Sequence, residues 1–320
     1  MEGSINGMND TAVLARAITW RSSKQSYLTA FLLADRDLVD DCLRGYAYFR
    51  WADDQIDIGC PSSKNCLDFL RRERALAESC YRGERPAELA PEEEMLADLI
   101  AHDRGTSDRL QSFIRNFFWV LEFDVRRRGR VVAAQELESY STHLAKAVMD
   151  GFQYFIGNAH AYPASPDRIT AVLGAHRTHM LRDLREDFAL GYVNLPIEAL
   201  PDGALPADGL DEETLRDWAR RETALARRML QDGRRYIDSL DHLRCKLAGT
   251  WYCARFDRVL DLIERDCYCL RADYPERRSL ATWVNIALLT VPVVIKHWSY
   301  LLRKQATRIA ARLEQKPEAL

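Results

Sequence analysis

Apolar residues recur every three to four positions along nearly the whole chain. This spacing is typical of amphipathic helices, and no segment shows the strict alternation of a half-buried strand. Glycine or proline interrupts the pattern where such helices would end. We therefore predict an all-α protein, with helices at about 24–51, 66–81, 92–102, 108–128, 134–158, 167–190, 212–240, 243–270 and 279–313.

The chain has no stretch long enough to be a linker between domains. Of its 320 residues, 47% are apolar, which is enough to build a sizeable core. We predict one domain over 1–320, with frayed ends at 1–15 and 314–320.

The charges nearly balance, since 45 Lys and Arg stand against 48 Asp and Glu. A net charge of −3 gives no general attraction to nucleic acid. The basic run at 126–130 is expected to be a solvated helix end. Eight cysteines without a C-x-x-C pair favour reduced thiols in a cytoplasmic protein.

The beginning of the chain lacks the basic and apolar regions of a signal peptide. The longest apolar stretch, 280–295, contains polar residues and is short for a membrane span, so we expect a buried core helix. The basic segment 296–312, with its interleaved Leu, Trp and Tyr, is expected to pack on the bundle. Peripheral membrane contact is the alternative.

Two aspartate clusters are the strongest chemical signal. Asp53 and Asp57 are four residues apart, so a helix would place both carboxylates on one face, with Asp54 at its edge. Asp183 and Asp187 repeat this spacing, and His176 and His179 extend their stripe.

One such cluster alone would be read as a charged helix end in solvent. Two clusters with the same spacing, each following an arginine within an apolar helix, favour a shared ligand. Carboxylate oxygens suit Mg²⁺, which phosphate oxygens commonly complete. The sequence therefore predicts Mg²⁺ and a bound diphosphate between two helices, and the histidines and cysteines lack a closed zinc set.

The residues around both clusters resemble the squalene/phytoene synthase family. Residues 46–57 (YAYFRWADDQID) look like its first aspartate-rich motif. Residues 180–187 (MLRDLRED), followed by Gly191 and Leu195-Pro196, look like the second. With Ser23-Lys24 and 121–124 also fitting, the resemblance covers about 20–300. It implies a class I isoprenoid synthase helical bundle with a central active-site cavity.

The resemblance also implies an enzyme that transfers prenyl groups from an allylic isoprenyl diphosphate with the help of Mg²⁺. Arginine pairs well with diphosphate oxygens because its guanidinium donates two parallel hydrogen bonds. The implied Mg²⁺ and diphosphate ligands are Asp53, Asp57, Asp183 and Asp187, supported by Asp54 and Glu186, with Arg50 and Arg182 on the diphosphate.

Three stretches depart from the family pattern. His176 and Thr178-His179 replace a glutamine and a Thr-Asn pair, and 191–196 (GYVNLP) lacks the usual Arg and Tyr. In 144–149 (LAKAVM), Lys and Met replace small residues that would line the prenyl cavity. Because these departures affect the side expected to bind a second prenyl chain, we predict a different acceptor.

The predicted acceptor is a small aromatic molecule, for example a carbazole, which would place the protein in secondary metabolism. His143, His179 or Lys146 would take the proton released on coupling. Phe49, Phe152 and Tyr154 are candidates to shield the allylic cation.

Head-to-head condensation of two prenyl diphosphates to a phytoene- or squalene-type product is the alternative. Cyclisation of one prenyl diphosphate and a non-catalytic assembly role are further alternatives, although the retained aspartates count against the last. No glycine-rich nucleotide fingerprint supports a reduction step.

Overall fold

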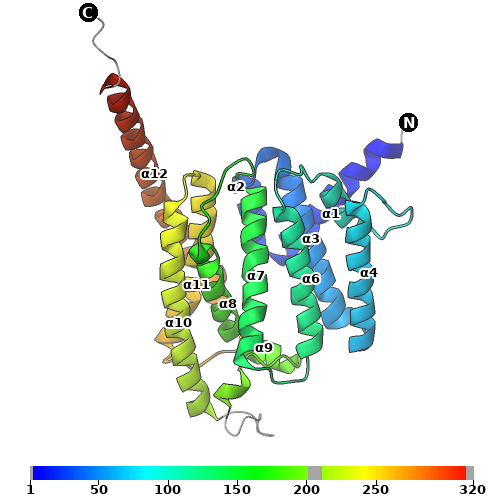
Figure 1. Ribbon diagram of the computed structural model, residues 1–320. Helices are drawn as coiled ribbons and strands as arrows, with labels where there is room; N and C mark the ends of the chain where they lie inside the picture. The colour runs from blue at the N-terminus through cyan, green and yellow to red at the C-terminus, as the bar shows by residue number, and fades with distance from the viewer. Residues whose placement is uncertain (1–2, 201–210, 315–320) are drawn as a thin grey trace, which may run out of the picture.

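The computed structural model describes the backbone of residues 3–200 and 211–314. Helices form all the extended regular structure in this part, and it contains no strand (Figure 1). The all-α prediction is therefore confirmed. The α-helices are α1 (Gly3–Ser22), α2 (Lys24–Leu33), α3 (Val39–Asp54), α4 (Ser63–Tyr81), α5 (Pro91–Ala101), α6 (Arg109–Arg127), α7 (Ala134–Phe155), α8 (Thr170–Arg182), α9 (Leu184–Ala189), α10 (Glu212–Ser239), α11 (Leu243–Arg265) and α12 (Leu280–Glu314).

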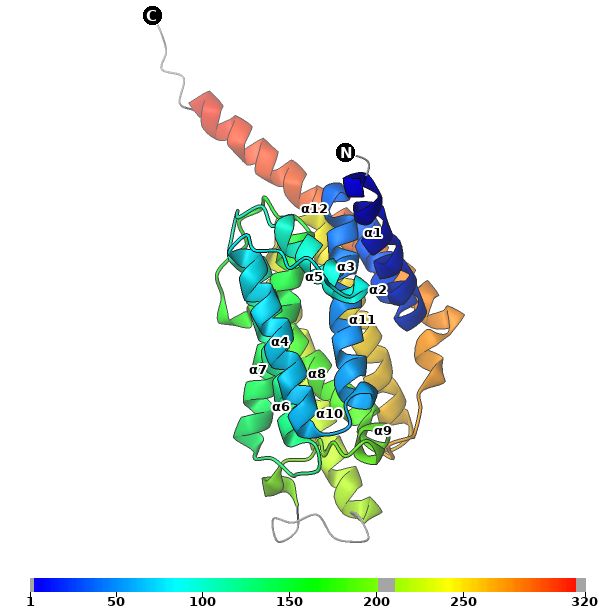
Figure 2. The same ribbon diagram turned by 90° about the vertical axis from the view of Figure 1, so that its right-hand side faces the viewer.

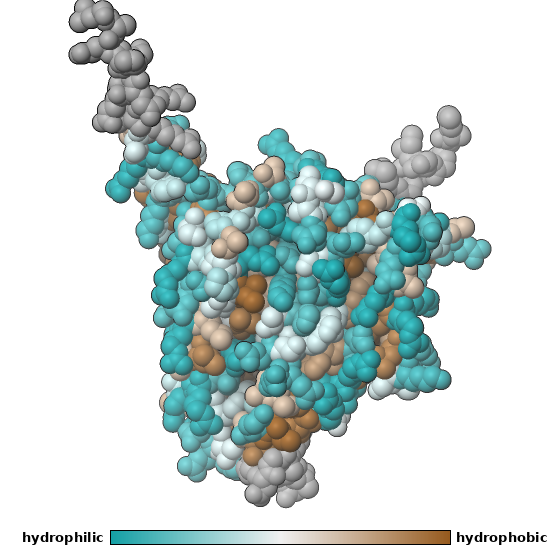
Figure 3. Space-filling model, viewed as in Figure 1, coloured by the Kyte–Doolittle hydropathy of each residue, from teal (hydrophilic) through white to brown (hydrophobic). Residues whose placement is uncertain are grey.

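The long helices run side by side and form a bundle (Figures 1 and 2). One apolar cluster joins the helices from α1 to α7, and a second joins α8, α10 and α11. Hydrophilic side chains cover most of the side seen in Figure 3, as expected for amphipathic helices around a core.

Glycine lets α8 and α10 approach each other closely. A Cβ atom on Gly233 of α10 would lie 2.2 Å from the backbone nitrogen of Ala171 on α8. A Cβ on Gly174 of α8 would lie 2.8 Å from the carbonyl oxygen of Ala226. These two helices therefore pack backbone to backbone and hold α8 firmly in the bundle.

The helix predicted at 24–51 is two helices, α2 and α3, separated around Asp35. The Asp35 carboxylate accepts hydrogen bonds from the backbone N–H groups of Gly157 and Asn158, and it pairs with Arg244. The Asp35 N–H donates to the Phe155 carbonyl at 2.8 Å. These contacts with distant segments break the helix, and periodicity could not predict them.

The helix predicted at 167–190 also breaks, at Asp183 between α8 and α9. Asp183 has φ −99° and ψ 8°, outside the regular helical range. Asp183 and Asp187 therefore do not lie on one continuous helix.

The chain start differs from the frayed end expected at 1–15, because α1 begins at Gly3. Thr11 and Ala15 are buried, and the Thr11 hydroxyl donates to Asp98 at 2.7 Å. At the other end α12 continues to Glu314, and residues 315–320 lie outside the described part.

The prediction of a buried core helix at 280–295 is wrong. Leu288 and Ile295 are 66% and 60% exposed, and α12 projects from the bundle (Figure 1). Its segment Val284–Thr307 is long and apolar enough to cross a membrane by length and composition. Helix α12 packs mainly against α11.

Candidate active site

A cavity of about 490 Å³ lies in the middle of the bundle, between α1, α2, α3, α6, α7, α8 and α11. Its volume is in the usual range for small-molecule sites. Charged residues, among them Asp53, Asp124 and Arg50, lie in its wall. Most of the remaining wall is apolar, and its aromatic members are Tyr46, Phe49, Phe113, Phe117, Tyr140, Phe152, Phe155 and Tyr252.

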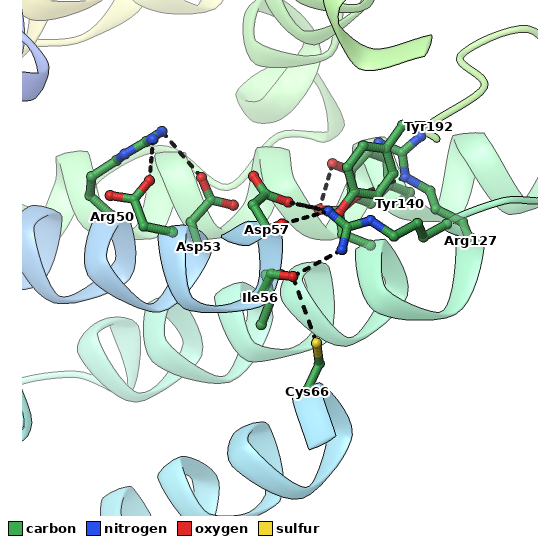
Figure 4. Close-up of polar contacts among 11 residues, drawn as sticks. Arg50, Asp53, Ile56, Asp57, Cys66, Arg127, Tyr140 and Tyr192 are labelled. Carbon is green, nitrogen blue, oxygen red and sulfur yellow. Dashed lines mark hydrogen bonds and ion pairs between the residues drawn. The ribbon is translucent and has the colours of Figure 1, made fainter. Parts of the chain in front are cut away.

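The first aspartate cluster lies where α3 ends. Asp53 is in the last turn of α3, and Asp57 follows in a short π-helical segment, Gln55–Gly59. Both carboxylates project from the same side of the chain (Figure 4). Arg50 donates to Asp53 at 3.2 Å and also pairs with Asp54, while Tyr192 donates to Asp57 at 2.8 Å.

Asp53 lies in an environment that disfavours its charge. Burial raises the pKa of Asp53 to about 7, and the nearby carboxylates of Asp57 and Asp124 add to the rise. Its ion pair with Arg50 only partly opposes this effect. Added positive charge beside the cluster would therefore favour the ionised form of Asp53.

The second cluster is held by different partners. Burial opposes the charge of Asp183, but hydrogen bonds from Arg182 and His179 hold the pKa of this carboxyl below its ordinary value. The His179 Nε2 atom lies 2.7 Å from Asp183. Burial and the Asp183 charge raise the pKa of Asp187 to about 6, although Asn194 donates to it at 2.6 Å.

A polar network connects the two clusters. Arg127 of α6 donates to Asp124 at 2.6 Å and to the Asn194 side-chain oxygen at 3.0 Å. The Asn194 amide in turn donates to Asp187. The Arg127 guanidinium also lies 4.7 Å from the ring centre of Tyr192, whose hydroxyl binds Asp57 (Figure 4). One arginine thus links both halves of the site.

The expectation that 126–130 is a solvated helix end is wrong for two of its arginines. Arg127 is 5% exposed and lies within the network. Arg128 donates to the carbonyl oxygens of Ile56 and Asp57 at 3.2 and 3.0 Å. The sequence signal for Arg127 is its spacing of three residues from Asp124, which places both on one helix face.

The departure at 191–196 supplies contacts rather than removing them. Tyr192 and Asn194, which replace other residues of the family pattern, bind Asp57 and Asp187. A glycine precedes them because Gly191 has φ +90°, a conformation that side chains rarely adopt. The turn therefore brings both side chains to the carboxylates.

Two of the three histidines singled out from the sequence lie in the cavity wall. His176 is buried, and its Nδ1 lies 2.9 Å from the Ser141 hydroxyl. Burial lowers the pKa of His176 well below its ordinary value and also lowers the pKa of His179, with nearby Arg182 adding to the latter. Burial therefore favours the neutral form of both imidazoles.

His143 and Lys146 are not among the residues that line this cavity. Lys146 is exposed, while His143 stacks on Trp119 and bonds to Asn116 beside a separate surface groove. Met149 is buried in an apolar cluster and does not line the cavity. The side chains expected to narrow the prenyl cavity point elsewhere.

The other residues named from the sequence divide as follows. Phe49 and Phe152 line the cavity, whereas Tyr154 is buried outside it and donates to Asp103 at 3.3 Å. Glu186 is exposed on α9.

Arg255 of α11 is a cavity residue that sequence reasoning missed. In the part of the chain that the structure describes, no carboxylate forms an ion pair with it. Burial and the neighbouring Arg182 lower its pKa below the usual arginine value. The Arg182 Nη1 atom is buried without a hydrogen-bond partner. Arg255 in the cavity wall and the neighbouring Arg182 thus retain capacity for an anion.

Among the described residues, no three His, Cys, Asp or Glu side chains are arranged as a metal site. The donor chemistry nevertheless fits Mg²⁺, because the aspartates offer carboxylate oxygens, and the carboxylates of Asp57 and Asp124 lie near enough to Asp53 to raise its pKa. The residues that would hold Mg²⁺ are those of the two aspartate clusters.

Comparisons with known proteins agree with this architecture. A family model for squalene/phytoene synthase matches residues 20–283. No curated protein sequence matches the chain. The fold is similar to that of the squalene synthase HpnC from Alicyclobacillus acidocaldarius, with a TM-score of 0.63 and 17% identity over 83% of this chain and 97% of that one. It is also similar to that of a dehydrosqualene synthase in complex with ligand, with a TM-score of 0.65 and 16% identity over 93% of this chain and 98% of the other.

Proposed function

The chain belongs to the squalene/phytoene synthase family, and from this premise we propose that it joins two prenyl diphosphates head to head. As a member of this family it is a prenyl-transferring enzyme that uses prenyl diphosphates. The proposed product is of the phytoene type. Its formation releases two diphosphates and two protons from two identical substrates and needs no reductant.

The observation that carries this proposal is the hydrogen-bonding capacity that two guanidinium groups, at and beside the cavity, keep for an anion. Arg50 is already paired with Asp53 and Asp54, but Arg255 and the Nη1 atom of Arg182 have no anionic partner among the described residues. Charge-assisted hydrogen bonds from such groups hold phosphate oxygens strongly. A site for more than one diphosphate explains why both are present.

The prediction of an aromatic acceptor loses its basis. It rested on three departures from the family pattern. Of these, Lys146 and Met149 do not line the prenyl cavity, and Tyr192 and Asn194 of the stretch 191–196 bind the aspartates. The α7 residues that do line the cavity include Leu144, Val148 and Gly151, and they make this part of its wall apolar. An apolar wall suits a second prenyl chain.

We assign the aspartates the following roles. Asp53, Asp57, Asp183 and Asp187 would hold Mg²⁺, which when bound supplies charge that favours departure of diphosphate. Asp54 keeps Arg50 in place, and Glu186 supports the second cluster.

Other side chains act on the prenyl groups. Arg50, Arg182 and Arg255 bind diphosphate oxygens. Phe49 and Phe152 present aromatic faces to the allylic cation. His176 and His179, which lie in the cavity wall, are placed to accept the protons released on coupling.

The test is product analysis with C10, C15 and C20 allylic diphosphates, each supplied alone, with and without Mg²⁺. A C30 or C40 hydrocarbon from one substrate, formed only with Mg²⁺, supports the proposal. A cyclised product with the carbon count of the donor, or slow hydrolysis without coupling, contradicts it.

Variants make the same test specific to the site. Asp53→Asn and Asp183→Asn should lower diphosphate release at least about a hundredfold, because each removes a charged ligand. Lys146→Ala should retain full turnover, since its side chain is exposed outside the cavity. Equal turnover in all three variants would contradict the assignment, provided that circular dichroism shows each to be folded.

A further inference from the structure

A continuous apolar stripe runs along the exposed side of α12. Its members are spaced alternately by four and three residues, which places them on one helix face. Each side chain is between 50% and 66% exposed. The α12 stripe consists of Val284, Leu288, Val291, Ile295, Trp298 and Leu302.

The opposite face of α12 is the one that attaches it to the bundle. Ile286 is buried, and Thr290 accepts a hydrogen bond from the Trp251 indole at 2.9 Å. Val293 packs against the apolar cluster that contains Leu247 of α11. The bundle therefore holds α12 in place while leaving the stripe uncovered.

Helix α2 continues this apolar region. Phe31 and Leu32 are 55% and 56% exposed, and neighbouring Leu33 belongs to the same cluster as Val293. Figure 2 shows the beginning of α12 close to α2. On its other side α2 lines the cavity, for example through Thr29. One short helix thus separates the active-site cavity from the exposed apolar surface.

Charge along α12 favours one kind of partner. Its sequence holds five basic residues and one acidic residue, and all five basic residues follow the apolar half that ends at Ile295. Trp298 and Tyr300 lie at the boundary between the two halves. An anionic lipid surface matches this order, since acyl chains take the stripe, aromatic rings suit the interface and headgroups attract Lys and Arg.

A second copy of the chain fits less well. The spacing of the stripe would allow two α12 helices to pair. Two parallel α12 helices, however, would bring their basic halves together. Two antiparallel helices would set the basic half of one against the apolar half of the other. Lys304 is the one basic side chain of the described set on α12 that has a carboxylate partner, Asp241 at 2.9 Å.

We propose that the α12 stripe, with the exposed end of α2, docks on the surface of an anionic phospholipid bilayer. Docking itself does not depend on the proposed function. Exit of an apolar product past α2 into the lipid does rest on that function.

Flotation of the full chain with vesicles tests docking without any substrate. We expect binding to vesicles of phosphatidylcholine with phosphatidylglycerol, weaker binding to phosphatidylcholine alone, and a decrease at high salt. Leu288→Asp and Ile295→Asp should each reduce the partition coefficient about tenfold or more. Val13→Asp, which alters a valine of α1 that is 65% exposed, should leave it unchanged.

Light scattering and turnover in detergent accompany this experiment. The docking variants should keep the catalytic rate of the parent chain, because neither residue lines the cavity. Absence of vesicle binding, or equal binding by parent and variants, would overturn the proposal. If light scattering shows that the parent chain is a dimer and that Leu288→Asp dissociates it, the stripe is instead a contact between copies. Because docking is measured without prenyl diphosphate, its failure is distinct from a failure of head-to-head coupling.

Discussion

Asn194 joins Arg127 to the second aspartate cluster with one side chain. Its oxygen accepts from Arg127 and its amide donates to Asp187, so it orients a charged partner on each side. Residues that hold ligand carboxylates in position commonly matter almost as much as the ligands. This position was read from the sequence only as a departure from a family pattern.

Replacing Asn194 should therefore impair catalysis more than stability. We expect Asn194→Ala to lower kcat/KM about 10- to 100-fold, because Asp187 loses its orienting donor. Steady-state kinetics with varied Mg²⁺ measure the effect, and a higher Mg²⁺ requirement should accompany it. Asn65→Ala, at an exposed position on α4, is the control. Unchanged kinetics in Asn194→Ala would show that the network is not needed.

Glu73 of α4 is a buried carboxyl group away from the active site. It accepts a hydrogen bond from the Tyr48 hydroxyl at 3.0 Å and pairs with Arg72. Burial raises the pKa of Glu73 to about 7, above an ordinary value of 4.5. The folded protein therefore holds this proton more tightly than the unfolded chain does.

The stability that this group contributes is fully present below about pH 4.5 and is lost as pH rises through about 7. Glu73→Gln should remove this loss. The variant should gain stability relative to the parent between pH 5 and pH 8, by up to about 3 kcal/mol. Urea unfolding of the parent and the variant at pH 5 and at pH 8 measures this gain in the free energy of unfolding. A difference between the two proteins that does not change with pH would contradict the prediction.

At the scale of elements, close packing between α8 and α10 positions the second cluster. Gly233 meets Ala171 with no space for a side chain. Gly233→Ala should therefore force the helices apart and lower the free energy of unfolding by about 1–3 kcal/mol. Gly45→Ala is the matched control, because its Cβ would meet Phe113 at an ordinary 3.4 Å and alanine favours a helix. Urea unfolding compares them, and equal stability would argue against tight packing.

The helices themselves were largely predictable from the sequence. Apolar periodicity locates α4, α5, α6, α7, α10, α11 and α12 to within a few residues. It fails at Asp183, which pairs with the nearby Arg182 and His179, and at Asp35, which distant residues hold. Periodicity reports only which face of a local helix is apolar, so it cannot detect a break imposed by a distant segment.

At the scale of the whole molecule, the cavity joins the two halves of the chain. Its wall takes residues from α1 to α3 and from α11, and the Arg127 network joins α6 to the turn at Asn194. The single domain predicted over 1–320 remains a prediction. We expect one unfolding transition, with far-UV circular dichroism and tryptophan fluorescence coinciding. Two separate midpoints would show that the halves unfold independently.

The sequence by itself determined the all-α class, the family and the two aspartate pairs, because helical periodicity and four-residue spacing are local properties of the chain. Only the tertiary structure decided that Lys146 and His143 lie outside the cavity, that Arg255 lies in its wall, and that α12 stays exposed. Each of these outcomes depends on how a helix is rotated and placed against its neighbours. That rotation follows from packing across the whole bundle, which no local pattern records.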